Sequence, residues 1–222
     1  MKKIFTSILA IVLVFTLLTT GVSAFTFEML EQEDVYEPDL IEKEKISSWA
    51  ESELEKARSA GLITPSTTYY MTRATTRFQF AELIVNMVEK VTGKTIEAAP
   101  SDTFTDCSEE AILKAYSAGI VSGIGNNLFA PDKNTNRQEI ATMIYRAILY
   151  IKEQTGTDLT PAAADLTGFT DKDQVASWAL EGVGRLAAND IMKGTSTTKL
   201  SPADSCTVEQ CIILVYRVYQ KI

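Results

Sequence analysis

Histidine is absent from the 222-residue chain, and its absence excludes a group of functions. Without imidazole there can be no histidine metal ligand, no Ser-His or Cys-His catalytic pair and no imidazole-based pH switch. Cysteine is scarce, with only Cys107, Cys206 and Cys211. A Cys107–Cys206 disulfide and free thiols both remain open from the sequence, whereas Cys211 falls on an apolar helix stripe and is expected to pack as a small apolar side chain.

Positive charge is in short supply. Lys and Arg number 21 against 29 Asp and Glu, which gives a formal net charge of −8. A strongly acidic chain is a poor partner for the phosphate backbone, so nucleic-acid binding is disfavoured. Acidic residues crowd into residues 25–45, which we expect to form an exposed acidic leader. The composition is otherwise that of a globular protein, since 45% of the residues are hydrophobic and 23% are charged.

Long apolar runs are lacking except near the N-terminus. There Lys2-Lys3 precedes an apolar run over residues 8–18, and Val22-Ser23-Ala24 follows it. This order is typical of a secretory signal peptide, so residues 1–24 are predicted to be removed by cleavage after Ala24. Retention as a membrane anchor is the alternative, because the run with its flanks is nearly long enough to span a bilayer. Cleavage would remove Lys2 and Lys3 and change the net charge from −8 to −10.

What the chain does contain is an internal repeat. A shift of 58 residues lays Ser59-Ala60-Gly61-Leu62 over Ser117-Ala118-Gly119-Ile120. A shift of 71 residues lays Tyr145-Arg146 over Tyr216-Arg217. A unit of two helices joined by a turn is therefore present more than once.

The tryptophans test this alignment independently. The two shifts sum to 129, and that sum places Trp49 on Trp178, a match that did not enter the alignment. We therefore predict three copies of the unit. They cover residues 46–93, 103–152 and 169–222, with residues 153–168 as a linker before the third copy.

The second half of each copy opens with a helix start signal. Thr76, Asn136 and Thr207 are each followed three residues later by Gln or Glu, which is the capping box that begins a helix. Apolar residues then recur at helical spacing, so each helix carries one apolar stripe that must be covered. Three such stripes are buried best against one another. We expect a mainly α fold with a pseudo-threefold, three-helix central bundle and prongs made of helices and loops.

The first helix of each copy has weaker start signals. Ser48 and Glu51 form a further capping box, which predicts a helix start in the first copy. In the second copy the first helix is expected to start at Asp106. Both helices would then pack on the outside of the bundle.

Five short motifs stand out. Four come from the second copy: Phe-x-Asp at Phe104, Gly-Ile-x-x-Gly ending at Gly123, Phe-x-Pro at Phe129 and Asn-Arg-x-Glu from Asn136. The fifth, Trp-Ala, comes from the third copy at Trp178. The set resembles the S-layer homology domain, which usually occurs as three tandem units, and the resemblance covers residues 46–222. It implies a three-pronged pseudo-trimer within one chain. It also implies non-covalent attachment of an exported protein to an anionic, often pyruvylated, secondary polysaccharide of the bacterial cell wall.

The resemblance suggests a polysaccharide site at the helix starts. Arg77 and Arg137 lie one step into their helices, where a bidentate cation beside unpaired N–H groups suits a carboxylate on a sugar. A salt bridge to an acidic residue of a neighbouring copy is the alternative for both arginines. The motif glycines Gly123 and Gly194 belong to the same candidate site.

Tryptophan and aspartate complete the candidate site. The faces of Trp49 and Trp178 suit the apolar side of a pyranose ring, although packing of the first helix on the bundle would use the same side chains. Asp106 and Asp171 are candidates for accepting hydrogen bonds from sugar hydroxyls. Helix capping is the alternative for both aspartates.

Each copy departs from the family pattern. Val208 replaces the arginine of the third copy, Cys107 replaces the tryptophan of the second, and Pro65 replaces the glycine of the first. No copy has the full set, so at most two of the three grooves between copies are expected to bind. No metal or cofactor is expected, because the calcium-loop-like run at residues 132–136 is followed by Arg137 where that loop needs glycine.

The leading hypothesis is a non-catalytic module, secreted to the surface of a bacterium, that anchors the exported protein to the cell wall through its polysaccharide. The short acidic segment before the repeats would carry little cargo. A protein-interaction or assembly scaffold that has lost sugar binding is the alternative, motivated by Val208 and Cys107, and it would act on a surface-protein partner. A hydrolase is disfavoured, because no carboxylate is set apart by an apolar pocket as a general acid.

Overall fold

The computed structural model describes residues 46–222, so the predicted signal peptide and acidic leader lie outside the described residues. Within that range the regular structure is helical, with no strand, which confirms a mainly α fold. No helix in this range has the length and apolar character needed to cross a bilayer. The α-helices are α2 (Glu51–Ser59), α3 (Arg77–Thr92), α4 (Glu110–Ser117), α5 (Arg137–Thr155), α6 (Leu180–Ala188) and α7 (Val208–Tyr219).

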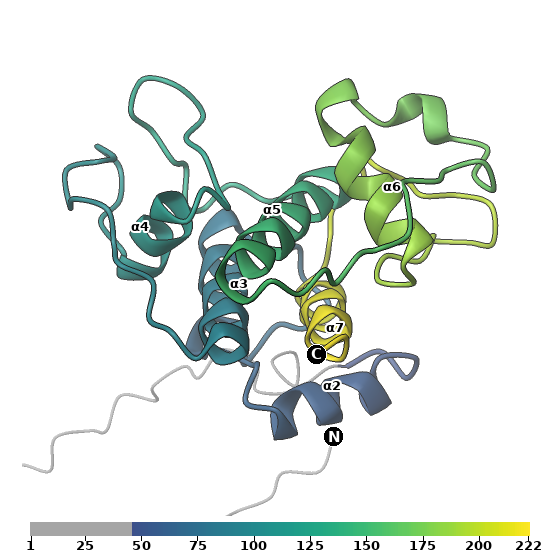
Figure 1. The fold of residues 1–222 in the computed structure, drawn as a ribbon, viewed down its shortest axis with the longest axis horizontal. Coiled ribbons are helices and arrows are strands. Elements are labelled where there is room, and N and C mark those ends of the chain that lie inside the picture. The colour runs from purple at the N-terminus through teal and green to yellow at the C-terminus, as the bar shows by residue number, and fades with distance from the viewer. Residues whose placement is uncertain (1–45) are drawn as a thin grey trace, which may run out of the picture. The chain divides into compact units, whose positions relative to one another are not determined.

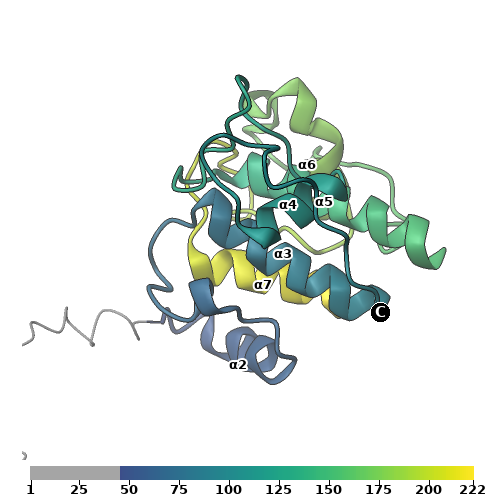
Figure 2. The same cartoon turned by 90° about the vertical axis from the view of Figure 1, so that its left-hand side faces the viewer.

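Helices α3, α5 and α7 pack against one another at the centre (Figures 1 and 2). All three predicted capping boxes are formed, with Thr76, Asn136 and Thr207 each accepting a hydrogen bond from the third backbone N–H of its helix. Their apolar stripes are buried, including Phe80, Ile140 and others along each helix. The expected three-helix central bundle is confirmed.

Three backbone hydrogen bonds close a ring where the bundle helices begin. Thr75 donates to the carbonyl of Cys206 at 2.9 Å, Thr135 donates to Thr75 at 2.9 Å, and Cys206 donates to Thr135 at 3.2 Å. Each of these residues directly precedes the N-cap of a bundle helix. The ring therefore joins the three copies around one pseudo-threefold axis.

The remaining helices surround the bundle in a fixed cyclic order. Helix α4 packs on α3, α6 packs on α5, and α2 packs on α7, so that the three outer helices lie on three different sides (Figure 1). Each outer helix thus lies on the bundle helix of the preceding copy, and the first copy closes onto the third. This interlocking brings residues of different copies into the same grooves.

Both expected starts of the outer helices are wrong. Helix α2 has Ala50 as its N-cap and no side-chain cap, so Ser48 and Glu51 form no capping box. Helix α4 begins at Glu110 with Glu109 as its N-cap, so Asp106 does not cap it. The physical reason in the second copy is that the carboxylate of Asp106 is used by a distant loop, as described below.

The three cysteines are free thiols in this structure. Cys206 and Cys211 are both fully buried, and Cys211 lies on the buried stripe as expected. Burial, together with the neighbouring Asp106 carboxylate, raises the pKa of Cys107 to about 11. Its thiol is therefore protonated at neutral pH and a poor nucleophile.

Candidate functional site: pockets between the copies

Arg77 holds the loop of the following copy. Its Nε donates to the carbonyl of Phe129 and its Nη2 to the carbonyl of Ser122, both at 2.8 Å. The guanidinium carbon also lies 4.4 Å from the centre of the Phe129 ring, a cation–π contact. The side chain is only 8% exposed, and burial lowers its pKa, although an arginine in a protein stays charged.

Arg137 repeats this contact one copy later. Its Nε donates to the carbonyl of Leu200 at 2.8 Å and its Nη2 to that of Lys193 at 2.9 Å. The side chain is 6% exposed. Two nitrogens of each arginine are therefore committed to backbone carbonyls, and neither arginine forms the salt bridge that was the sequence-based alternative.

Asp106 and Asp171 hold the same loops from the other side. The oxygens of Asp106 accept from the N–H groups of Phe129 and Ala130 at 2.9 and 2.7 Å. Those of Asp171 accept from the next copy's equivalents, Leu200 and Ser201, at 2.9 and 2.8 Å. The Phe129 N–H lowers the pKa of Asp106, and at Asp171 two backbone N–H groups outweigh burial, so its pKa is lowered too.

The motif glycines permit close approach of the backbone. A Cβ atom on Gly194 would lie 2.4 Å from the carbonyl oxygens of Lys199 and Ser196, and one on Gly123 would lie 2.9 Å from the oxygen of Leu128. Any side chain there would force the loop open. In the first copy Pro65 instead begins a short 3-10 turn, so the loop at this position has a different form.

A pocket of about 240 Å³, the Trp178 pocket, gathers residues from all three copies. Arg77 comes from the first copy, Ser122 and Gly123 from the loop of the second, and Trp178 from the third. Its complete lining is Arg77, Ser122, Gly123, Glu139, Thr142, Met143, Arg146 and Trp178.

A second pocket of about 440 Å³, the Trp49 pocket, has the same construction. Each of the eight residues of the Trp178 pocket has its repeat-equivalent here, under the sequence shifts of 60, 71 and 129. The lining is Trp49, Arg137, Lys193, Gly194, Thr195, Gln210, Ile213, Leu214 and Arg217. The structure thus brings six predicted site residues together as two equivalent triads, Arg77 with Gly123 and Trp178, and Arg137 with Gly194 and Trp49.

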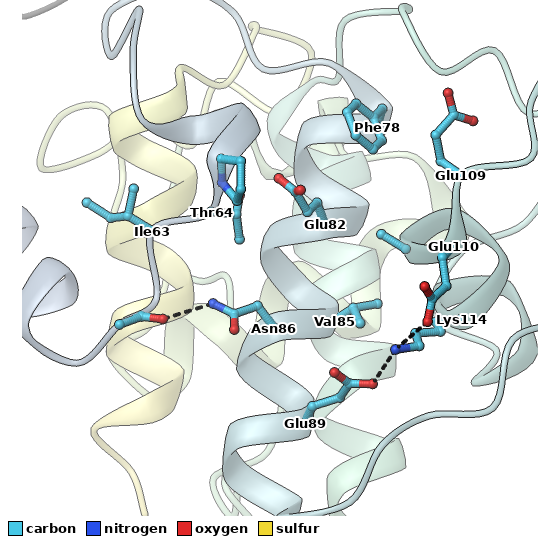
Figure 3. A pocket seen from close by; sticks show the side chains of 13 residues that line it. Ile63, Thr64, Phe78, Glu82, Val85, Asn86, Glu89, Glu109, Glu110 and Lys114 are labelled. Atoms are coloured by element: carbon cyan, nitrogen blue, oxygen red, sulfur yellow. Dashed lines mark hydrogen bonds and ion pairs between the residues drawn. The ribbon is translucent and has the colours of Figure 1, made fainter.

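The third groove, which we call the Phe78 pocket, is the largest of the three at about 530 Å³ and has different chemistry (Figure 3). Neither of its walls carries an arginine or a tryptophan. Asn86 stands at the position of Arg146 and donates to the carbonyl of Gly61 at 3.0 Å. Lys114 lies between Glu89 and Glu110, at 3.1 and 2.9 Å from their carboxylates (Figure 3). This acidic wall is unsuited to an anionic sugar.

Five residues have a place in the site that differs from the sequence-based prediction. Asp106 and Asp171 do not line either Trp pocket, because their carboxylates bind the loop backbone. Arg146, Arg217 and Lys193 do line the pockets but were not selected. The match of Tyr145-Arg146 with Tyr216-Arg217 was the signal that could have identified the two arginines.

The tryptophans are open to solvent. Trp49 is 56% exposed and Trp178 is 57% exposed, a large apolar surface for a side chain without a partner to cover it. Each stands beside guanidinium groups, so each pocket offers a flat apolar face and a cation to one ligand. Among the described residues, no group of His, Cys, Asp and Glu side chains is arranged to hold a metal ion.

Parts of this chain are similar to a known protein family and to known proteins. The family model of the S-layer homology domain matches residues 104–141 and 168–207, which lie in the second and third copies. An endoglucanase of Bacillus sp. (strain KSM-635) is 27% identical over 163 residues, covering 72% of this chain and 16% of the enzyme. An amylopullulanase of Thermoanaerobacterium thermosulfurigenes is 23% identical, covering 91% of this chain and 11% of that protein.

The exoglucanase XynX of Acetivibrio thermocellus is 24% identical, covering 78% of this chain and 16% of the enzyme. The chain therefore corresponds to a small part of the length of each of these three relatives.

Proposed function

We propose that this chain, whose residues 104–141 and 168–207 match the family model of the S-layer homology domain, is a non-catalytic cell-surface module. It anchors the exported protein to the wall of a bacterium by binding an anionic secondary wall polysaccharide. The observation that carries this proposal is the pair of equivalent pockets, each combining an arginine, a close-packed glycine loop and an exposed tryptophan from three different copies.

The chemistry of the pockets suits a sugar that carries a carboxylate, such as a pyruvate ketal. The exposed indole faces of Trp49 and Trp178 can cover the apolar side of a pyranose ring. Arg146 in one pocket and Lys193 in the other supply positive charge at the wall. Arg77 and Arg137 support the glycine loops from beneath, and their own charges add to the local potential.

Binding must come from these local contacts, because the chain as a whole is acidic. Salt screens the long-range repulsion between the chain and an anionic polymer more than it screens a close, partly buried pair. Moderate salt should therefore leave binding intact. The Phe78 pocket, with its carboxylates, is not proposed as a third site.

The activities named for the relatives are not carried over to this chain, because it corresponds to at most 16% of each of them. In our proposal, the part that this chain shares with its relatives attaches the protein to the cell wall. The chain then requires no cofactor, and its partner is the wall polymer. A surface protein as an additional partner is compatible with this role.

Cosedimentation with purified cell walls tests the proposal. The chain is mixed with intact walls and with walls from which the secondary polysaccharide has been chemically removed, and the pelleted fraction is measured. We expect pelleting with intact walls and loss of pelleting with stripped walls. Equal pelleting with both would reject sugar anchoring and favour the assembly scaffold.

A further inference from the structure

Glu53 distinguishes the two Trp pockets. Arg146 on α5 and Arg217 on α7 stand at the same place in the Trp178 and Trp49 pockets. The Nε and Nη2 atoms of Arg217 donate to the two carboxylate oxygens of Glu53 at 2.8 and 2.7 Å, a bidentate ion pair. Arg146 is exposed and has no hydrogen-bond or ion-pair partner among residues 46–222. The same arginine is thus occupied in one pocket and available in the other.

The difference follows from one position of the outer helices. Helices α2 and α6 have the same length and are related by the shift of 129 residues, which places Glu53 on Gly182. Gly182 packs closely on α5, where an added Cβ atom would lie 3.3 Å from Tyr145 Cβ and from the carbonyl oxygen of Ala141. This position therefore carries no carboxylate that could reach Arg146.

We propose that Glu53 is an internal competitor for the anionic ligand in the Trp49 pocket, and that Arg146 is the ligand-binding cation of the Trp178 pocket. This inference rests on the proposed function. A carboxylate that engages a guanidinium through both oxygens makes the same contact as a sugar-borne carboxylate would. A ligand entering the Trp49 pocket must displace Glu53 from Arg217, whereas in the Trp178 pocket it meets Arg146 directly.

Each Trp pocket is also lined by one further charged side chain, Lys193 in the Trp49 pocket and Glu139 in the Trp178 pocket. Lys193 lines the Trp49 pocket and remains a cation there, but an ammonium cannot reproduce the planar two-point contact of a guanidinium. Glu139 lines the Trp178 pocket, and its Oε2 atom accepts the N–H of Asn136 at 3.0 Å as part of the capping box. Glu139 is therefore held at the helix start and is not paired with Arg146.

The two tryptophans provide a separate signal for each pocket, because they are the only two in the chain. In Trp178→Phe the fluorescence reports on Trp49, and in Trp49→Phe it reports on Trp178. The probe is a methyl hexoside carrying a 4,6-pyruvate ketal, titrated into each variant. Melting temperatures are recorded to verify that every variant is folded.

In the Trp178→Phe background, Glu53→Gln should tighten probe binding at Trp49 by about three- to tenfold, since it releases Arg217. Glu53→Ala should do the same. Glu55→Gln is the matched control: it lies on the same helix and changes the net charge equally, but its carboxylate lies near Arg58 and not Arg217. In the Trp49→Phe background, Arg146→Gln should weaken binding at Trp178 by about tenfold.

The outcomes separate this inference from the proposed function. If Glu53→Gln and Glu55→Gln bind the probe equally while the wild type still binds, the competitor role is overturned and the proposed function stands. If Arg146→Gln binds as tightly as its parent, the assignment of Arg146 is overturned. If neither tryptophan responds in any variant, both the inference and the proposed function fail.

Discussion

Arg137 fixes the loop of the third copy through two buried carbonyl oxygens, and this contact sets the cost of replacing it. A lysine keeps the charge but cannot span both acceptors, so Arg137→Lys should leave one carbonyl without its donor. We expect it to lower the free energy of unfolding by about 2 kcal/mol, measured by urea denaturation.

Arg146→Lys is the matched control, since Arg146 is exposed and its replacement should change stability by less than about 0.5 kcal/mol. Equal losses in the two variants would show that the two carbonyl contacts of Arg137 do not stabilise the loop. The burial of Arg77 and Arg137 also means that alanine variants of these residues would disturb the loops. Such variants are poor tests of sugar contact.

Acid should destabilise the protein by protonating Asp106 and Asp171, which hold the loops. The pKa values of Asp106 and Asp171 are lowered in the folded protein, so the carboxylates contribute stability above their unfolded value of about 3.9. This contribution is lost as the pH falls through the folded pKa, because the protonated carboxyl can no longer accept both N–H groups. The free energy of unfolding should therefore fall below about pH 4.

Replacing Asp171 with Asn should flatten this pH dependence, measured by urea unfolding between pH 7 and pH 3. The control is Asp173→Asn, at a nearby exposed position in the same segment. An unchanged pH profile in the Asp171 variant would show that its two backbone contacts do not contribute to stability.

At the scale of elements, the glycine loop is the part least able to change. Gly194→Ala would push a Cβ atom to 2.4 Å from two backbone oxygens, which a flexible neighbour cannot relieve. We expect a loss of more than about 2 kcal/mol in unfolding free energy and a weaker response of Trp49 to ligand. Gly168→Ala, where nothing lies within 4 Å of the added atom, should be nearly neutral.

The elements also differ in how well the sequence predicts them. The capping boxes at Thr76, Asn136 and Thr207 were predicted correctly because both partners of each box lie within four residues. The start of α4 was not, because Asp106 finds its partners 23 and 24 residues away. Local signals fix helix starts only when the capping side chain has no stronger distant partner.

At the scale of the whole described region, interlocking should make unfolding cooperative. Helix α2 of the first copy packs on α7 of the third, and Leu54 is buried in that contact. Leu54→Ala should destabilise the region by about 2–5 kcal/mol. Trp49 and Trp178 lie in different copies. Because the copies interlock, the fluorescence of each tryptophan should report the same urea midpoint. Two separate midpoints would contradict interlocking.

The repeat alignment predicted the closed bundle, because three equivalent apolar stripes have few other ways to be buried. It did not predict which copies share a pocket. Trp178 meets Arg77 from two copies earlier, since each outer helix lies on the preceding copy's bundle helix. That packing order depends on the loops between helices, which the motifs do not encode.

The two Trp pockets are the proposed sites of polysaccharide binding. The most direct measurement is isothermal titration of purified wall polysaccharide into the wild type and into the Trp49→Ala, Trp178→Ala double variant. Because both side chains are more than half exposed, the variant should keep its melting temperature. We predict binding by the wild type and at least about tenfold weaker binding by the variant. Equal affinities for the two proteins would contradict the account.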